Sequence, residues 1–319
     1  MKKENSFRLF GIFGYPLGHT LSPVMQEAAF EKLGIQAYYL PFEMRPAPFR
    51  KVMNGIHRLI LDGFNVTVPY KTEVISFLDG LTPDARIIGA VNTVFRKGRK
   101  WRGANTDWEG FLRSLKKEGG FSPRGKRVLI LGAGGSARAV VFGLAKSSVG
   151  EINIAARRLS RARKIAGDFR PRFPGTRFQG LPLAKKDLRA ALEDADLVVN
   201  ATSAGVIFGS KKLLPDSLIP RSKRNQRKFF FDLVYPRGNS TPFLKSAKAK
   251  GHRILNGTGM LVYQGARAFE YWTGRKAPAA VMRRALENNF LGTDFLGTGP
   301  LRIPGPVPKK APGTLRAAG

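Results

Sequence analysis

Short apolar runs alternate with segments of helical spacing in the first part of the chain. Three of the runs have the length and composition of β-strands: residues 7–13, 37–42 and 63–69. Between these runs, apolar residues recur at helical spacing over 22–33 and 49–61. The first helix is expected to begin at Ser22-Pro23, with serine as its cap and proline in its first turn. This rhythm predicts a parallel sheet flanked by helices.

The same pattern starts again near residue 126. Strand-like runs recur at 126–131, 151–155, 197–200 and 229–233. A glycine-rich turn at 132–135 and a helix over 136–146 follow the first of them, which is the order of a doubly wound nucleotide-binding domain. A long amphipathic helix is predicted at 260–273, beyond the last of these strands.

The length and composition of the chain fit a protein with two cores, since its 319 residues, 43% of them hydrophobic, exceed what one core usually takes. No run approaches the roughly 18 apolar residues of a membrane span, and polar residues interrupt the first ten positions, so we expect a cytoplasmic protein without a signal peptide. Cysteine is absent, and His19, His57 and His252 are too scattered to suggest a metal site. The basic Gly- and Pro-rich stretch at 293–319 is expected to be disordered.

The chain is strongly basic, with 55 Lys and Arg residues against 22 acids and a formal net charge of +33. Such a charge is typical of nucleic-acid-binding proteins. Here the basic residues are spread along the chain, and no aromatic-interleaved RNA motif or zinc finger accompanies them. We therefore favour a metabolic enzyme with anionic ligands and expect no specific nucleic-acid partner, only nonspecific binding that fades with salt.

The turn after the strand at 126–131 has the features of a pyrophosphate-binding loop. Two of its glycines allow a tight turn and close backbone approach, and the following helix offers free N–H groups to negative charge. Ala137 stands in place of the usual third glycine and is small enough for that packing role. Placement between a strand and a helix favours a dinucleotide site over a plain turn. The residues expected to line it are Gly132, Ala133, Gly134, Gly135 and Ser136.

The end of the next strand selects between the two nicotinamide cofactors. An NAD enzyme commonly places an acidic residue there to hold the ribose 2′-hydroxyl. This chain has no acid at that point and instead follows Ala156 with Arg157, Arg158 and Arg161. Because guanidinium groups match the oxygens of a 2′-phosphate, we predict NADP(H) as the cofactor.

Lys71 and Asp107 are candidates for proton transfer. Lys71 follows a predicted strand closed by Pro69, where sheets of this kind place their ligands. Asp107, in the Asn-Thr-Asp run at 105–107, is available to pair with it. Such a pair is a credible proton donor and acceptor beside a reacting carbonyl or alcohol, although either residue alone is more often a surface charge.

Several ordered motifs within residues 10–274 together resemble the shikimate dehydrogenase family. They are GYPLGHTLSP at 14–23, NVTVPYK at 65–71, GAVNT at 89–93, NTD at 105–107, GAGGSAR at 132–138, NATSAG at 200–205, DLVY at 232–235 and GTGMLVYQGA at 257–266. An ordered set is far more specific than any one motif. The resemblance implies a reversible, NADPH-dependent reduction of the ketone of 3-dehydroshikimate to shikimate, in aromatic amino-acid biosynthesis.

The resemblance also implies roles for individual residues. Lys71 and Asp107 resemble the catalytic pair that protonates the developing alkoxide. Thr20 and Ser22 match the positions whose hydroxyls hold the substrate carboxylate. Further substrate contacts are implied at Thr67, Asn92, Tyr235 and Gln264, and contacts on the nicotinamide side at Thr202, Gly257 and Met260.

The family fold implies an α/β protein with its site between two domains. Residues 1–106 plus 257–292 are then a discontinuous βαβ substrate domain, and residues 107–256 a Rossmann-like doubly wound NADP-binding domain. Closure of the cleft between them is expected to exclude water from the reacting groups. The expected partner is the small substrate, and the sequence leaves a monomer and a homodimer equally open.

The nearest alternative is a quinate/shikimate dehydrogenase with broader substrate use. Thr20 stands where the family usually has serine, and its extra methyl group either crowds the carboxylate pocket or reshapes it for quinate. Such relatives more often use NAD, which the arginines argue against. A methylene-tetrahydrofolate dehydrogenase does not explain the 89–93 and 257–266 motifs, and a nucleic-acid-binding protein built on a Rossmann domain is supported by charge alone.

Overall fold

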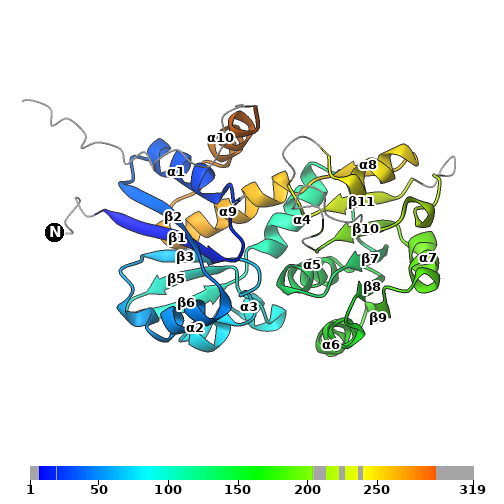
Figure 1. The fold of residues 1–319 in the computed structure, drawn as a ribbon, viewed down its shortest axis with the longest axis horizontal. Coiled ribbons are helices and arrows are strands. Elements are labelled where there is room, and N and C mark those ends of the chain that lie inside the picture. The colour runs from blue at the N-terminus through cyan, green and yellow to red at the C-terminus, as the bar shows by residue number, and fades with distance from the viewer. Residues whose placement is uncertain are drawn as a thin grey trace, which may run out of the picture.

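The computed structural model describes residues 7–18, 20–202, 204, 213–222, 227–235 and 240–291. Within them the chain forms two six-stranded sheets with helices packed on their faces, and the two units lie side by side along the longest axis of the molecule (Figure 1). His19 and the stretch expected to be disordered, 293–319, lie outside the described residues. The predicted α/β class is confirmed.

The first sheet is mixed. Its strands in spatial order are β2 (Ala37–Glu43), β1 (Arg8–Gly14), β3 (Gly63–Val66), β5 (Thr93–Lys97), β6 (Lys100–Ala104) and β4 (Gly80–Leu81). β1 pairs in parallel with β2 and β3, but β5 is antiparallel to both β3 and β6. The parallel pairing predicted from the first three runs is confirmed for β1, β2 and β3, but the sheet as a whole is mixed. The antiparallel part is the β5–β6 hairpin, which turns at Gly98 with a φ of +63°. Arginines and lysines interrupt the alternation of apolar and polar residues in its strands, so the sequence pattern did not predict it.

The second sheet is parallel throughout. Its strands in spatial order are β12 (Arg253–Leu255), β11 (Phe229–Asp232), β10 (Leu197–Asn200), β7 (Arg127–Leu131), β8 (Glu151–Ala156) and β9 (Arg177–Pro182). The chain winds outward from β7 on one side and from β10 on the other. This is the predicted doubly wound arrangement, and its ligand-binding switch point lies where β7 and β10 meet.

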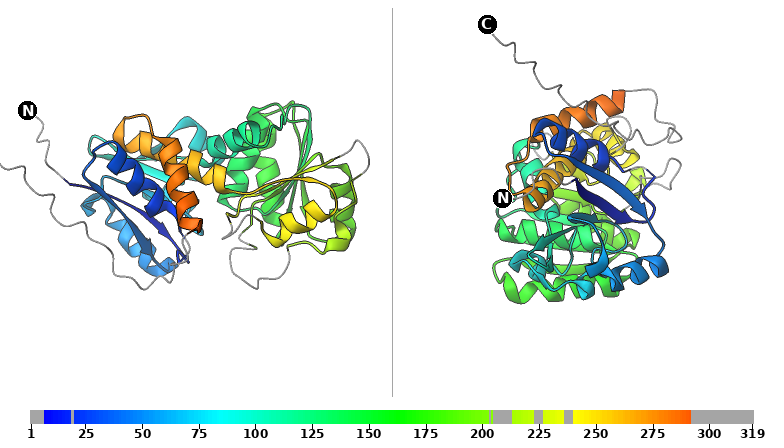
Figure 2. Two further views of the ribbon diagram at one scale, coloured as in Figure 1. Left: turned by 90° about the horizontal axis from the view of Figure 1, so that it is seen from above. Right: turned by 90° about the vertical axis from the view of Figure 1, so that its left-hand side faces the viewer.

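Helices cover the faces of both sheets (Figure 2). Their bounds are α1 (Ser22–Lys32), α2 (Pro46–Asn54), α3 (Pro83–Ile88), α4 (Asp107–Lys117), α5 (Gly135–Lys146), α6 (Leu159–Phe169), α7 (Lys185–Asp194), α8 (Pro242–Ala249), α9 (Thr258–Thr273) and α10 (Ala279–Leu291). Short 3₁₀ helices lie at Ile56–Arg58, Val74–Phe77, Arg170–Arg172 and Asp216–Leu218.

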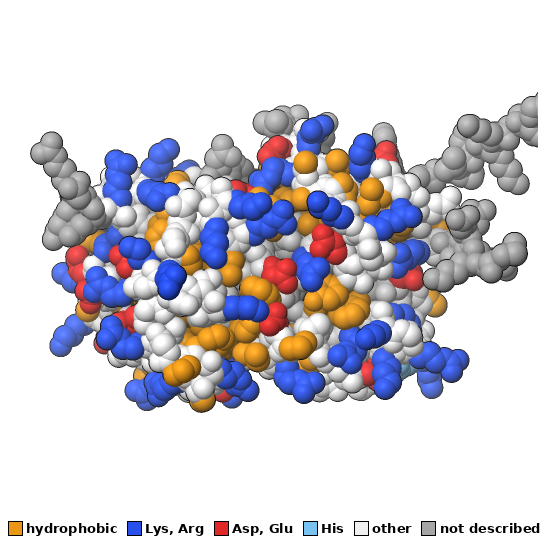
Figure 3. Space-filling model, turned by 180° about the vertical axis from the view of Figure 1, so that it is seen from behind, with side chains coloured by type: hydrophobic (Ala, Val, Ile, Leu, Met, Phe, Trp, Pro, Cys, Tyr) orange, Lys and Arg blue, Asp and Glu red, His pale blue; other side chains and the backbone are white. Residues whose placement is uncertain are grey.

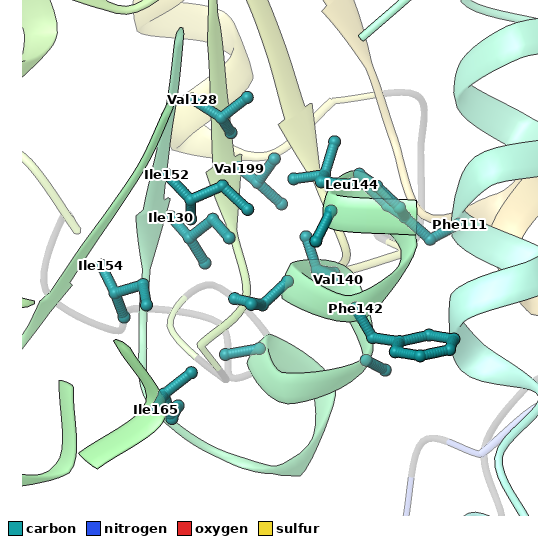
Figure 4. Close-up of a cluster of buried hydrophobic side chains, with 14 of the residues drawn as sticks. Phe111, Val128, Ile130, Val140, Phe142, Leu144, Ile152, Ile154, Ile165 and Val199 are labelled. Carbon is teal, nitrogen blue, oxygen red and sulfur yellow. The ribbon is translucent and has the colours of Figure 1, made fainter. Parts of the chain in front are cut away.

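The core of the second unit is made by strand side chains that meet α5. Branched residues of β7, β8 and β10, such as Ile130, Ile154 and Val199, point at Val140 and Leu144 of α5 (Figure 4). Phe111 of α4 joins the same core, so α4 is anchored to the second sheet. Burial of each such side chain contributes about 1.5–3 kcal/mol.

The chain returns to the first sheet after the second is complete. Phe269 and Trp272 of α9 share a core with Phe10 of β1 and Met25 of α1, and Trp272 Nε1 donates to the Val94 carbonyl at 3.0 Å. α9 also packs along α4. A segment that follows the nucleotide-binding unit in sequence is thereby built into the other unit.

Three local predictions are wrong in detail. Ser22 does not cap α1, because Leu21 is the N-cap residue and the Ser22 hydroxyl bonds to Tyr39 instead. The helix expected over 49–61 begins earlier, at Pro46, and ends at Asn54, where Gly55 stops it and a single 3₁₀ turn follows. β3 likewise ends at Val66, and Thr67 begins a turn closed by Tyr70 N donating to the Thr67 carbonyl.

Candidate active site

Lys71 and Asp107 form a buried ion pair, as predicted. Lys71 Nζ lies 2.7 Å from Asp107 Oδ2, and the two residues are only 9% and 4% exposed. Lys71 leaves the turn after β3, and its carbonyl accepts from Val91 N at 2.7 Å. Asp107 is the first residue of α4, where the free N–H groups favour a carboxylate. The pair therefore sits on rigid elements of both units.

Asn92 ties this pair to α9. Its Nδ2 lies 2.9 Å from Asp107 Oδ1 and 3.2 Å from Gln264 Oε1, and its Oδ1 accepts from Thr106 N at 2.7 Å. Asn92 is 3% exposed, so its orientation is fixed by these bonds. Four predicted site residues from distant parts of the chain, Lys71, Asn92, Asp107 and Gln264, thus meet at one point.

A second polar group joins the two units at the predicted carboxylate pocket. Tyr235, which follows β11, hydrogen-bonds to the Thr20 side chain and to the backbone of Leu21, and burial raises the pKa of its hydroxyl. Ser22 lies at the start of α1 beside these residues. Thr67 is half-buried in the turn that leads to Lys71. Among the predicted substrate contacts, Thr20 and Tyr235 therefore meet across the two units.

Sequence reasoning missed Tyr39 and Asn65, which support this pocket from beneath. Tyr39 OH donates to Asn65 Oδ1 at 2.7 Å and bonds to the Ser22 side chain, and burial raises its pKa well above the ordinary value. Asn65 Nδ2 donates in turn to the Asn92 carbonyl at 2.9 Å. One signal could have found Tyr39. The alternation of β2 places it on a buried face, and a buried hydroxyl needs a hydrogen-bond partner.

The glycine-rich turn fits a pyrophosphate and touches Lys71. Gly132 has a φ of +115°, in the region that favours glycine, and α5 begins at Gly135 with its first N–H groups free of helical partners. A Cβ on Gly135 would lie 2.8 Å from Lys71 Cβ, and Ser136 Oγ lies 3.1 Å from Lys71 Nζ. The predicted cofactor turn and the ion pair are thus in direct contact.

The arginines after β8 are free to bind an anion. Arg157, Arg158 and Arg161 are exposed, and none of them forms an ion pair within the described part of the chain. Ala156 ends β8 and is buried beneath them. Basic side chains are also scattered widely over the face of the molecule shown in Figure 3, without gathering in one patch. The three arginines differ from these in lying at the carboxyl end of the strand next to the glycine turn.

Of three further predicted residues, Thr202 lies against the glycine turn, where a Cβ on Gly132 would be 3.0 Å from its Cγ2. Thr202 follows β10, and Gly257 and Met260 lie at the start of α9. No cluster of His, Asp and Glu that suits a metal ion occurs among the described residues, and none of the helices described there is long and apolar enough to span a membrane. A doubly wound sheet with this turn, joined to a second sheet through a buried Lys–Asp pair, defines a two-domain dehydrogenase that uses a dinucleotide.

Comparison with known proteins narrows this class to one family. Models of the shikimate dehydrogenase substrate binding domain, of shikimate/quinate 5-dehydrogenase and of the shikimate 5′-dehydrogenase C-terminal domain match residues 12–94, 115–248 and 257–287. Shikimate dehydrogenase (NADP⁺) of Geobacter metallireducens is 43% identical, with 87% of this chain and 95% of the relative covered. For that of Methanopyrus kandleri the figures are 42%, 86% and 93%.

A solved structure agrees with these relatives. Shikimate 5-dehydrogenase from Thermus thermophilus, in complex with NADP(H) and shikimate, superposes with a TM-score of 0.73 at 36% identity, covering 88% of this chain and 99% of its own. The chain belongs to the shikimate dehydrogenase family, which confirms the resemblance drawn from the motifs.

Proposed function

We propose that this protein is an NADP-dependent shikimate dehydrogenase, which reversibly reduces 3-dehydroshikimate to shikimate. The observation that carries the proposal is the buried Lys71–Asp107 pair, held by Asn92 and in contact with the cofactor turn at Ser136. Relatives named shikimate dehydrogenase (NADP⁺) and a neighbour solved with NADP(H) and shikimate support the same substrate and cofactor. The three free arginines favour NADP over NAD.

In this proposal Lys71 carries the proton that is transferred, a role that its buried pairing with Asp107 supports. When bound, NADPH supplies a hydride to the carbonyl carbon of the substrate. Lys71 Nζ gives a proton to the carbonyl oxygen as charge develops there, and Asp107 keeps the ammonium oriented. In the oxidation direction the pair takes the hydroxyl proton. The proton moves on a buried, preorganised pair, so little reorganisation is needed.

The remaining predicted contacts orient the substrate. Asn92 and Gln264, with Thr67, face the ring hydroxyls in this proposal, and Thr20 and Ser22 take the carboxylate. Tyr235 closes the same pocket from the opposite unit. Neutral donors and acceptors on fixed elements suit a small polyhydroxylated acid, because they bind it in one orientation.

The domain limits of 1–106 plus 257–292 and of 107–256 belong to this proposal. They are supported by the core that α9 and α10 share with β1, and by the anchoring of Phe111 in the second core. A cytoplasmic location and a monomeric or homodimeric state likewise stay proposals.

The direct experiment is to follow reduced-nicotinamide absorbance with purified protein in four mixtures, NADP or NAD with shikimate or quinate. The proposal predicts fast reduction with NADP and shikimate. Because Thr20 carries an extra methyl group against the predicted carboxylate site, quinate is kept as a secondary substrate. A quinate kcat/KM equal to that of shikimate, or comparable kcat/KM values with NAD and NADP, would overturn that part of the assignment.

A further inference from the structure

A fully buried carboxylate lies at the carboxyl edge of the second sheet and has no part in the chemistry above. Asp232 ends β11 opposite Asn200 at the end of β10, and both are 0% exposed. Its Oδ1 accepts from Asn200 Nδ2 at 2.8 Å and from Val234 N at 3.1 Å, and its Oδ2 accepts from Thr241 Oγ1 at 2.6 Å. We call Asn200, Asp232, Val234 and Thr241 the Asp232 cluster.

The cluster fixes the turn that follows β10. With Nδ2 of Asn200 held by the carboxylate, its Oδ1 faces the turn and accepts from Thr202 N at 2.9 Å and Thr202 Oγ1 at 2.7 Å. An amide has one donor end and one acceptor end, so the carboxylate decides which end meets Thr202. Thr202 is one of the residues predicted to border the nicotinamide.

The cluster also fixes the segment that follows β11. The Val234 carbonyl accepts from Gly257 N at 3.1 Å, and a Cβ on Gly257 would lie 2.1 Å from the Leu233 carbonyl oxygen. The segment is therefore pressed against the start of α9, the helix that carries Gln264. Tyr235, the next residue, reaches across to Thr20.

We propose that Asp232 is a positioning residue, which aligns the turn carrying Thr202 with the segment carrying Tyr235. This alignment sets the orientation of the bound cofactor relative to the bound substrate. The inference rests on the proposed function, because it takes these segments as borders of the nicotinamide and of the substrate. Asp232 acts through Asn200 and Val234 and contacts neither ligand itself.

The protonation of Asp232 is coupled to this role. Burial raises the pKa of Asp232 to about 6, against the lowering effect of the hydrogen bonds from Thr241, Val234 and Asn200. Among the described residues, the groups that face it come from the cap of α8, from the turn after β11 and from β10, and these three are uncharged donors. A proton on the carboxyl group weakens the bonds to those donors, so the alignment loosens as the pH falls through about 6.

The test compares Asp232→Asn with Asp196→Asn as the matched control. Asp196 precedes β10 at the opposite edge of the same sheet, where its Oδ2 accepts from Arg127 N at 2.8 Å. At pH 8 we expect Asp232→Asn to raise KM for NADP by about 10-fold or more, as for loss of a charge-assisted hydrogen bond. It should also lower kcat with shikimate, whereas Asp196→Asn stays within about twofold of the wild type in both.

The pH profile separates positioning from a loss of stability. A phosphate monoester also loses its second proton near pH 6, so the readout is the ratio of variant to wild-type KM for NADP from pH 5 to 8. The inference predicts a ratio that rises with pH for Asp232→Asn and a flat ratio for Asp196→Asn. Wild-type constants for Asp232→Asn, or equal effects of the two variants, would overturn it.

A second pair of variants covers the case in which Asp232→Asn does not fold. Thr241→Val removes the donor to Oδ2 and should raise KM for NADP, and Thr241→Ser should restore the wild-type value because it keeps the hydroxyl. Equal KM values for these two variants would contradict the inference. Titration of each variant with NADPH by fluorescence repeats the comparison without turnover, so a wild type inactive with shikimate would refute the proposed function and leave this test intact.

Discussion

Replacement of Lys71 by methionine should damage activity and stability for separable reasons. Methionine keeps most of the volume of lysine but has no proton to give, so kcat should fall by about 10²- to 10⁴-fold, equivalent to about 3–5 kcal/mol of activation free energy. NADP binding should be nearly unchanged. Kinetics at saturating NADP, with binding followed separately, measure both effects.

The same substitution leaves Asp107 as a buried carboxylate without its cation. Removal of one partner of a buried ion pair costs about 3–5 kcal/mol. Since Asn92 Nδ2 still donates to Asp107 Oδ1 at 2.9 Å, we expect a loss near the lower end, about 3 kcal/mol of unfolding free energy in urea titrations. The double variant Lys71→Met/Asp107→Asn removes the stranded charge, so most of that stability should return.

The double variant is decisive because its stability should recover while its activity should not. The reasoning predicts a stable protein with kcat no higher than that of Lys71→Met. A double variant as unstable as the single one would mean that the pair is not an electrostatic unit. A Lys71→Met protein with full kcat would remove Lys71 from the mechanism.

Three further predictions follow from contacts of single residues. Arg158→Gln should raise KM for NADP by about tenfold while leaving KM for NAD nearly unchanged, because only NADP carries the 2′-phosphate, and equal changes would point to a structural effect. Gly135→Ala should lower kcat by about 10²-fold, since its Cβ would lie 2.8 Å from Lys71 Cβ, whereas Gly167→Ala on α6, with open space around the added atom, serves as the control. The wild type should lose up to about 3 kcal/mol of unfolding free energy relative to Asp232→Asn as the pH rises from 3.8 to about 6. The reason is that the folded protein holds the Asp232 proton more tightly than the unfolded chain does. A difference that stays constant across that window in urea titrations would refute this prediction.

The nucleotide-binding half could be predicted from the sequence because its signals are local. Buried parallel strands read as continuous apolar runs, and β10 matches the predicted residues 197–200. The glycine turn between a strand and a helix likewise needs no knowledge of distant residues. β9 and β12 escaped prediction, since polar residues or short length hide them.

The first half was harder to predict because its sheet depends on pairing between distant segments. The β5–β6 hairpin carries arginines and lysines on its exposed face, and nothing local marks β5 as antiparallel to β3. The antiparallel hairpin was therefore not predicted, although β1, β2 and α1 were placed correctly to within a few residues and β1 pairs in parallel with β2 and β3 as expected.

The candidate active site likewise combines contacts that the sequence predicted with contacts that it did not. The pairing of Lys71 with Asp107 was predicted and confirmed, whereas its contact with Ser136 arises only when the two units meet. The support of Ser22 by Tyr39 and the bond between Asp232 and Asn200 join residues that the sequence separates. Buried polar partners of this kind follow from three-dimensional packing, so one sequence does not reveal them.

The central claim is tested most directly by the reduction of 3-dehydroshikimate with NADPH, followed as loss of reduced-nicotinamide absorbance in the wild type and in Lys71→Met. The account predicts saturable turnover by the wild type, within the usual range of about 1–10³ s⁻¹, and a rate lower by about 10²- to 10⁴-fold in the variant. Absence of turnover by a folded wild type that binds NADPH, or equal rates for the two proteins, would contradict it.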